Sequence, residues 1–179
     1  MPFTPVHFLP GLLLKGAAPR RVSWTAFAAS NVVIDLESFY YLVHDKWPVH
    51  RQLHTFVGAA IAGIVTIGLC LALRAGFMRI GAARSWLATG GPFMRAELSS
   101  GAIAIGAMVG ALTHPVLDGL MHQDIEPLQP WTSYNPLRGL VSVGALHWAC
   151  LIAGLIGALL ITMRRLSPRD DEDTSRRAS

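Results

Sequence analysis

Charged residues are scarce in this chain of 179 residues: only 15% are Asp, Glu, Lys or Arg, whereas 52% are hydrophobic. This balance excludes an ordinary soluble domain and indicates a small polytopic membrane protein, with membrane lipids and no nucleic acid among its partners. The chain has two cysteines, Cys70 and Cys150, and each lies in an apolar segment far from the other. Their placement excludes a CxxC metal site and a disulfide framework.

Common catalytic motifs are also missing from the sequence. It has no Gly-rich phosphate-binding loop, no HExxH and no GxSxG. A function must therefore be sought in the polar residues that interrupt the apolar segments, because ionisable groups inside a membrane are costly and need a partner or a task.

The apolar segments predict the fold class. Four of them are long enough to cross a membrane: Val22–Val43, Phe56–Leu73, Leu98–Met121 and Gly139–Met163. The segment Val6–Leu14 is too short to span and predicts a short N-terminal membrane helix. We therefore predict an all-α polytopic membrane helix bundle with four full transmembrane helices plus this short helix. Residues 1–163 form one membrane-embedded domain, and residues 164–179 form a disordered charged tail.

The placement of Lys and Arg predicts the orientation of the bundle. Twelve basic residues fall on one side: Lys15, Arg20, Arg21, Arg74, Arg79, Arg84, Arg95, Arg164, Arg165, Arg169, Arg176 and Arg177. Only three, Lys46, Arg51 and Arg138, fall on the other. The positive-inside rule puts the first set, with the C-terminus, in the cytoplasm of a bacterial inner membrane. Most of the polar residues in and beside the membrane then gather toward the exterior face.

The end of the segment 98–121 carries three residues able to bind metal. His114, Asp118 and His122 follow one another at intervals of four, so they lie along one stripe of a helix. A buried Asp118 would cost roughly 2.5–3.5 kcal/mol without a partner. Carboxylate and imidazole are both normal zinc ligands, so a metal ion is the simplest partner. The alternative is a polar helix end with a structural hydrogen-bonding aspartate.

A second polar group lies in the segment 22–43. Asn31 and Asp35 are four residues apart and share a helix face, whereas Glu37 points roughly 160° away from Asp35. We expect Asp35 to ligate a metal ion or to orient a ligand. Glu37 is a catalytic carboxylate, a surface position near the helix end, or a salt-bridge partner of Arg51.

The remaining histidines are spread over the chain. His50 and His54 are again four residues apart, a spacing that lets two imidazoles of one helix reach one metal ion. Between them, Arg51 is either a catalytic group that stabilises negative charge or an interfacial arginine reaching for headgroups. His7 is an interfacial residue or a ligand. For His147 we favour a buried, hydrogen-bonded imidazole over a metal ligand.

Read in order, these motifs resemble the predicted inner-membrane metal-dependent hydrolases. The resemblance rests on His7, Asp35-Leu36-Glu37, His50-Arg51 with His54-Thr55, and His114 with Asp118, and it covers most of residues 1–140. It implies a metal-ligand set of His7, Asp35, His50, His54, His114 and Asp118. The DxD element of the family is Asp35-Leu36-Glu37 here, and the two histidines of its His-Arg element stand one residue closer. Which of His50 and His54 ligates directly therefore stays open.

Together the residues and the resemblance predict a membrane-embedded hydrolase that uses one or two zinc ions. The candidate metal ligands are His7, Asp35, His50, His54, His114, Asp118 and His122, with Glu37 and Arg51 as catalytic groups. A phosphoester or lipid headgroup at the exterior face is the expected substrate. The alternatives are a non-enzymatic protein that handles metal ions or protons, and a structural membrane protein whose polar residues lock helices together.

Overall fold

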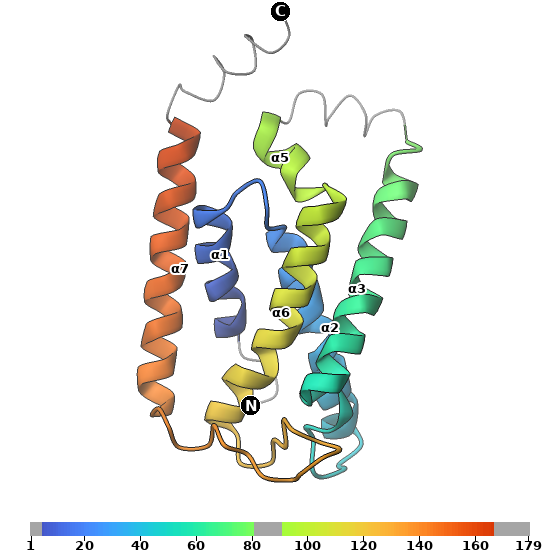
Figure 1. Cartoon of the computed structure of the whole chain (residues 1–179), viewed down its shortest axis with the longest axis vertical. Helices are drawn as coiled ribbons and strands as arrows, with labels where there is room; N and C mark the ends of the chain where they lie inside the picture. The colour runs from blue at the N-terminus through green and yellow to red at the C-terminus, as the bar shows by residue number, and fades with distance from the viewer. Residues whose placement is uncertain (1–4, 81–90, 167–179) are drawn as a thin grey trace, which may run out of the picture.

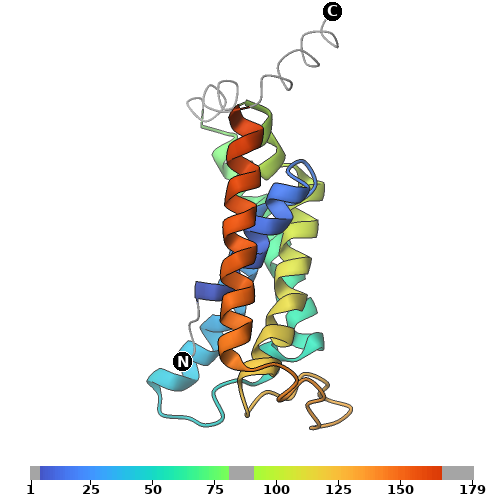
Figure 2. The ribbon, with the colours of Figure 1, turned by 90° about the vertical axis from the view of Figure 1, so that its left-hand side faces the viewer.

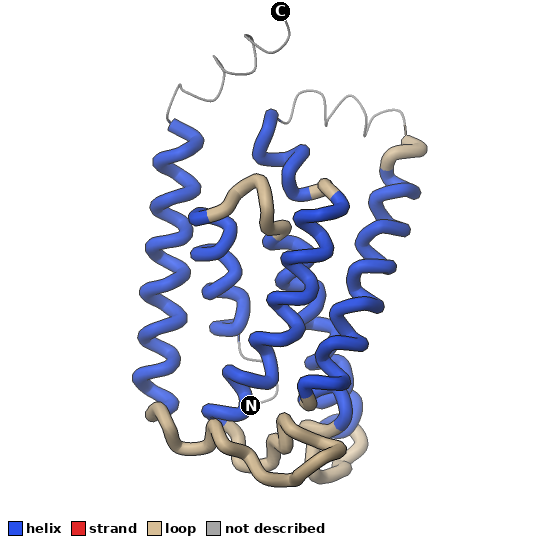
Figure 3. The backbone as a smooth tube through the Cα atoms, in the orientation of Figure 1, coloured by secondary structure: helices blue, strands red, loops and turns tan. Residues whose placement is uncertain are grey.

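The computed structural model describes residues 5–80 and 91–166, and all regular structure in these residues is helical (Figures 1 and 3). The elements are η1 (Pro5–Phe8), α1 (Leu9–Ala17), α2 (Trp24–Val43), η2 (Gln52–His54), α3 (Phe56–Phe77), α5 (Gly91–Glu97), α6 (Ser100–Met121) and α7 (Val143–Leu166). The prediction of an all-α fold is confirmed.

Three helices within the described ranges are long and apolar enough to cross a membrane, namely α3, α6 and α7. The helix α1 continues from η1, and the two form a shorter apolar helix over Val6–Ala17, three residues longer than the predicted segment Val6–Leu14. The predicted fourth span is the 20-residue helix α2, which is not among the three because Asn31, Asp35 and Glu37 lower its mean hydropathy.

Side-chain caps set the starts of three long helices. Ser23, Thr55 and Ser99 stand before α2, α3 and α6, and each side-chain oxygen accepts a hydrogen bond from a backbone N–H three residues later. The helices α2 and α6 therefore start two residues later than the predicted segments Val22–Val43 and Leu98–Met121. The last helix begins at Val143 rather than Gly139 and continues to Leu166, three residues into the predicted tail. The rest of that tail lies outside the described residues.

Glycines bring the central helices close together. The helix α6 packs against both α2 and α3, and α2 lies behind them in Figure 1. A Cβ atom on Gly106 would lie 2.2 Å from the carbonyl oxygen of Ser23, and one on Gly110 would lie 2.4 Å from Ser30 Oγ. These two glycines therefore let α6 approach α2 closely, and this contact places the polar face of α2 against His114.

The other contact layer joins α1 to α7. A Cβ atom on Gly157 would lie 2.3 Å from the carbonyl carbon of Leu12, so α7 can approach α1 only through glycine at this position. Figure 2, turned by 90°, shows α7 running along the outside of the bundle. The loops that join α2 to α3 and α6 to α7 gather at one end of the bundle, the lower end in Figure 3. The backbone N–H of Phe56 donates to the carbonyl of Pro127 over 2.9 Å and holds these two loops together.

Candidate metal centre

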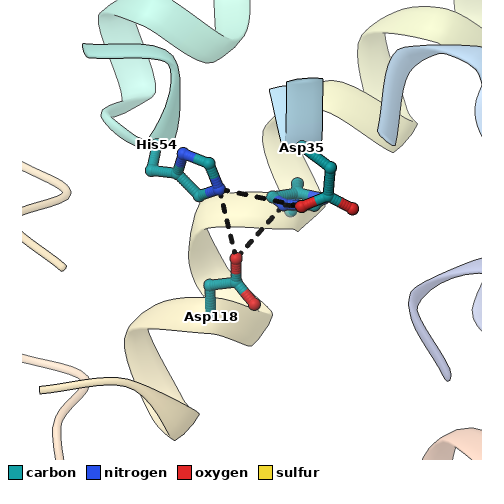
Figure 4. A group of neighbouring side chains, drawn as sticks. Asp35, His54 and Asp118 are labelled. Atoms are coloured by element: carbon teal, nitrogen blue, oxygen red, sulfur yellow. Dashed lines mark ion pairs between the residues drawn. The ribbon is translucent and has the colours of Figure 1, made fainter. Parts of the chain in front are cut away.

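Two histidines and two aspartates meet in the interior near the loop end of the bundle. Asp35 comes from α2, His54 ends η2, and His114 and Asp118 lie one turn apart on α6. All four are buried, and one donor atom from each lies within 4.8 Å of the others. In Figure 4 the side chains of Asp35, His54 and Asp118 point toward one another. We call these four residues the inner group.

The spacing of the inner group suits a tetrahedral ion. Asp118 Oδ2 lies 3.1 Å from His114 Nε2 and 3.5 Å from His54 Nε2. Asp35 Oδ1 lies 3.3 Å from His114 Nε2 and 3.9 Å from His54 Nε2. Zinc bonds to nitrogen and oxygen of about 2.0–2.1 Å place tetrahedral ligand atoms roughly 3.4 Å apart. The four donors therefore lie near ligand spacing.

The chemistry of the donors also calls for a cation. Asn31 Nδ2 donates to the carbonyl of Phe27 over 2.8 Å, which leaves Asn31 Oδ1 to accept from His114 Nδ1 over 2.8 Å. A neutral His114 then turns the lone pair of Nε2 toward two carboxylate oxygens. Within the described part of the chain, this buried Nε2 has no hydrogen-bond partner. An unpaired buried polar atom costs about 1–3 kcal/mol, and a metal ion would satisfy it.

His54 is held from its other side by Glu37. Glu37 Oε2 accepts from the backbone N–H of Leu53 over 2.9 Å and lies 3.5 Å from His54 Nδ1, so the opposite nitrogen of His54 faces the inner group. Burial lowers the pKa of His54, but hydrogen bonds to Asp35 and Glu37 outweigh burial and hold that pKa above its ordinary value. The same negative surroundings that favour a proton on His54 also favour a metal cation.

The second carboxylate oxygen of Asp118, Oδ1, faces away from the inner group. Asp118 Oδ1 lies 3.2 Å from His7 Nε2 and 3.9 Å from His122 Nε2. Within residues 5–80 and 91–166, this oxygen and both ring nitrogens of His7 are buried without a hydrogen-bond partner. His7 therefore joins the site from the N-terminal segment, and one carboxylate connects it to the inner group.

A second set of donors lies beside the first and nearer the surface. It contains His50, His122 and Asp124, whose donor atoms lie within 4.8 Å of one another. We call these three residues the outer group. Burial and the neighbouring His54 lower the pKa of His50, which favours the neutral imidazole that binds metal. Burial raises the pKa of Asp124, but its hydrogen bond with His50 outweighs burial. The pKa of this carboxyl therefore lies below its ordinary value.

A cavity of about 480 Å³ opens beside the outer group. His50, Asp124, Arg51 and Glu126 are among the residues that line it. Arg51 donates through Nε to the carbonyl of Pro48 over 2.9 Å and through Nη2 to that of Trp47 over 3.3 Å. Its guanidinium also lies 3.9 Å from the ring centroid of Tyr41. Through these contacts Arg51 holds the loop between α2 and α3. Its catalytic role stays a prediction.

The structure brings all seven predicted metal ligands to one end of the bundle, but it divides them differently from the sequence pattern. His50 and His54 do not share a helix face, because His54 ends η2 and His50 precedes it. His54 belongs to the inner group and His50 to the outer group. His122 caps the end of α6 with extended backbone, so it leaves the stripe of His114 and Asp118. Glu37 contacts His54, and its predicted catalytic role is untested.

Two of the site's residues carry roles that sequence reasoning did not assign. Asp124 is not among the ligands predicted from the sequence, and it joins the outer group because the loop after α6 returns it to His50. Ser38 Oγ lies 3.3 Å from His54 Nε2, one turn beyond Asp35 on α2. His147 contacts neither group, and its Nδ1 bonds the carbonyl of Val143 over 2.7 Å.

Comparisons with family models, with curated proteins and with solved structures gave no match. The resemblance carried by the motifs therefore stays a prediction, and the function has to be argued from the geometry of the two groups.

Proposed function

We propose that this protein is a membrane-embedded, metal-dependent hydrolase of the bacterial inner membrane. The observation that carries the proposal is the inner group, in which four buried donors lie near ligand spacing. The unpaired His114 Nε2 within that group supports a bound cation, because burial without a partner is unfavourable. Zinc is the metal we expect, since two imidazoles and two carboxylates form a ligand set that zinc accepts.

In this proposal α2 crosses the membrane as a fourth span. Its inward face carries the buried Asn31 and Asp35, whereas Leu36 and Phe39 are exposed on its outer face. An apolar outer face over a polar inner one is the arrangement that a membrane bundle with a buried site requires. The last turns of α3 and α7 carry Arg74, Arg164 and Arg165 and lie at the other end of the bundle (Figure 1), so in this proposal the site opens toward the exterior face and the C-terminus is cytoplasmic.

A bound divalent ion would supply Lewis-acid activation of water near neutral pH. Asp35, His54, His114 and Asp118 would hold it, while Asn31 and Glu37 fix the two imidazole rings. Glu126 lines the cavity and is placed to accept a proton there. The cavity at the loop end would take a phosphoester, such as a lipid headgroup presented at the membrane surface.

The experiment is metal analysis and hydrolysis by the same purified protein in detergent. We expect bound zinc and turnover of a phosphoester panel that includes a soluble aryl phosphate and phospholipid vesicles. Chelation should abolish turnover, and zinc should restore it. Asp118→Asn should lose both metal and activity, while His147→Ala, a histidine outside both groups, should keep both.

A second candidate is a protein that holds or moves metal ions without hydrolysis. The inner group favours it, because four protein ligands complete a tetrahedral set, as in structural zinc sites, and water could bind such an ion only as a fifth ligand. Zinc-loaded protein without turnover on any ester of the panel would support this candidate and contradict the hydrolase.

A further inference from the structure

The outer group differs from the inner group in the way a substrate-binding metal site differs from a closed one. The inner group offers four buried donors, which complete a tetrahedral set. The outer group offers three donors, two of them only half-buried, beside the cavity lined by His50 and Asp124. A site with three protein ligands keeps a position for water or substrate.

The donor atoms of the three outer residues lie within 4.8 Å of one another. His50 Nδ1 lies 2.9 Å from Asp124 Oδ2. The rings of His50 and His122 are stacked with centroids 4.6 Å apart. The fold creates this arrangement at one place, because α6 ends at Met121 and the chain turns there to deliver His122 and Asp124 to the loop of His50.

The two groups are connected by one carboxylate. Asp118 Oδ2 belongs to the inner group, 3.1 Å from His114 Nε2. Asp118 Oδ1 points the other way, 3.2 Å from His7 Nε2 and 3.9 Å from His122 Nε2, and is buried with no hydrogen-bond partner among the described residues. The rings of His50 and His54, one from each group, are 4.8 Å apart. A carboxylate with one oxygen toward each group is placed to bridge two cations.

We propose that His50, His122 and Asp124 form a second divalent-cation site, that Asp118 is shared between the two sites, and that this outer, open site is where a phosphoester meets the metal. The last part rests on the proposed hydrolase function; the second cation does not. The inner site then holds its ion permanently and fixes the shared carboxylate, while the outer site exposes its ion to the cavity.

The test is the metal stoichiometry of the full-length protein in detergent. The protein is stripped with chelator and titrated with Zn²⁺. We expect two equivalents for the wild type, the first bound more tightly. His122→Ala and Asp124→Asn should each bind one equivalent and keep the tight one, whereas Asp35→Asn should lose the tight one. His147→Ala is the matched control and should bind two.

A single equivalent in the wild type, or two equivalents in both His122→Ala and Asp124→Asn, would overturn the second site. Asp124→Asn changes a half-buried loop residue by one atom, so it keeps the test usable if His122→Ala does not fold. Hydrolysis is measured on the same samples. Two equivalents without turnover leave the second site standing and reject the hydrolase, whereas turnover with one equivalent does the reverse. Turnover that survives in zinc-saturated Asp124→Asn with one equivalent would overturn the assignment of substrate to the outer site.

Discussion

Asn31 Oδ1 accepts a hydrogen bond from His114 Nδ1 over 2.8 Å, and this bond between α2 and α6 decides which ring nitrogen of His114 faces the carboxylates. The asparagine is itself held, because its Nδ2 donates to the carbonyl of Phe27 over 2.8 Å. Asn31 therefore orients a candidate metal ligand through the ring nitrogen that faces away from the carboxylates. Partners of this kind fix the tautomer and the ring orientation of a ligand histidine.

Asn31→Leu should weaken zinc binding at the inner group by roughly 10–100-fold, because His114 loses the acceptor that orients it. Asn31→Asp keeps an acceptor at the same position and should retain most of the affinity. Zinc titration of the two purified variants measures the difference. Wild-type affinity in Asn31→Leu would show that packing alone orients His114.

Asp118→Asn should reduce metal content more than Glu37→Gln. Asp118 is buried and lies within 3.5 Å of both inner histidines, so its loss removes a ligand. Glu37 touches only the far nitrogen of His54, over 3.5 Å, so its loss should cost roughly 10–100-fold in affinity and leave the site able to fill. Metal analysis after dialysis against a weak chelator compares the two. A larger loss at Glu37 would mean that the ligand shell is wrongly assigned.

The parts of the fold that the sequence predicts are those set by local pattern. Apolar segments locate the long helices because burial in a membrane needs about 20 apolar residues. The spacing of His114 and Asp118 places them on one face because both lie within one continuous helix. Helix ends are predicted less well, because Ser23 and Ser99 move two of the starts by capping them.

The rest depends on contacts between distant segments. The hydrogen bond from His114 to Asn31 joins residues 83 positions apart, and that from His50 to Asp124 joins residues 74 positions apart. No periodic pattern in the sequence predicts either of these hydrogen bonds. The spacing of His50 and His54 predicts a shared helix face, but this stretch forms a loop and a short η2 because the chain must turn between α2 and α3. Their spacing predicts that both imidazoles can reach one metal ion, whereas the structure places them in different groups.

Gly110→Ala should destabilise the bundle by about 1–3 kcal/mol, because the added methyl group would overpack the contact of α6 with α2. Its Cβ would lie 2.4 Å from Ser30 Oγ and 2.6 Å from the carbonyl oxygen of Phe27, and the backbone cannot easily move away. Gly101→Ala is the matched control on the same helix, since a Cβ there meets nothing within 4 Å. Thermal unfolding in detergent measures both. Equal midpoints would show that α2 and α6 are not held together at Gly110.

The basic residues predict a cytoplasmic C-terminus and an exterior loop between α6 and α7. Alkaline phosphatase fused after Ser179 should be inactive, and green fluorescent protein fused there should fluoresce. The same two reporters inserted after Trp131, an exposed residue of the loop, should behave in the opposite way. An active phosphatase at the C-terminus would invert the topology and place both metal groups on the cytoplasmic side.

At the opposite end of the bundle from the metal groups, Lys15 and Glu97 form a buried ion pair. Lys15 Nζ lies 2.5 Å from Glu97 Oε1 and also donates to the carbonyls of Pro19 and Val22. Glu97 Oε2 accepts from Ser23 Oγ over 3.0 Å, so this carboxylate also supports the start of α2. Burial raises the pKa of Glu97, but its hydrogen bond and charge interaction with Lys15 outweigh burial, and the pKa lies below its ordinary value of 4.5.

A carboxyl whose pKa is lower in the folded state stabilises the fold at every pH above its ordinary value, and this stabilisation is lost as the pH falls through the folded pKa. The unfolding midpoint of the wild type should therefore fall as the pH drops below about 4.5, where the unfolded chain takes up the proton first. Glu97→Gln should reduce the free energy of unfolding at neutral pH by an amount on the order of 3 kcal/mol, and so lower the midpoint, because the buried Lys15 is left unpaired. Its midpoint should also depend less steeply on acid. The double variant Lys15→Met/Glu97→Gln removes both charges and should recover much of the loss. Parallel pH profiles for the wild type and Glu97→Gln would show that this pair does not carry the acid sensitivity of the bundle.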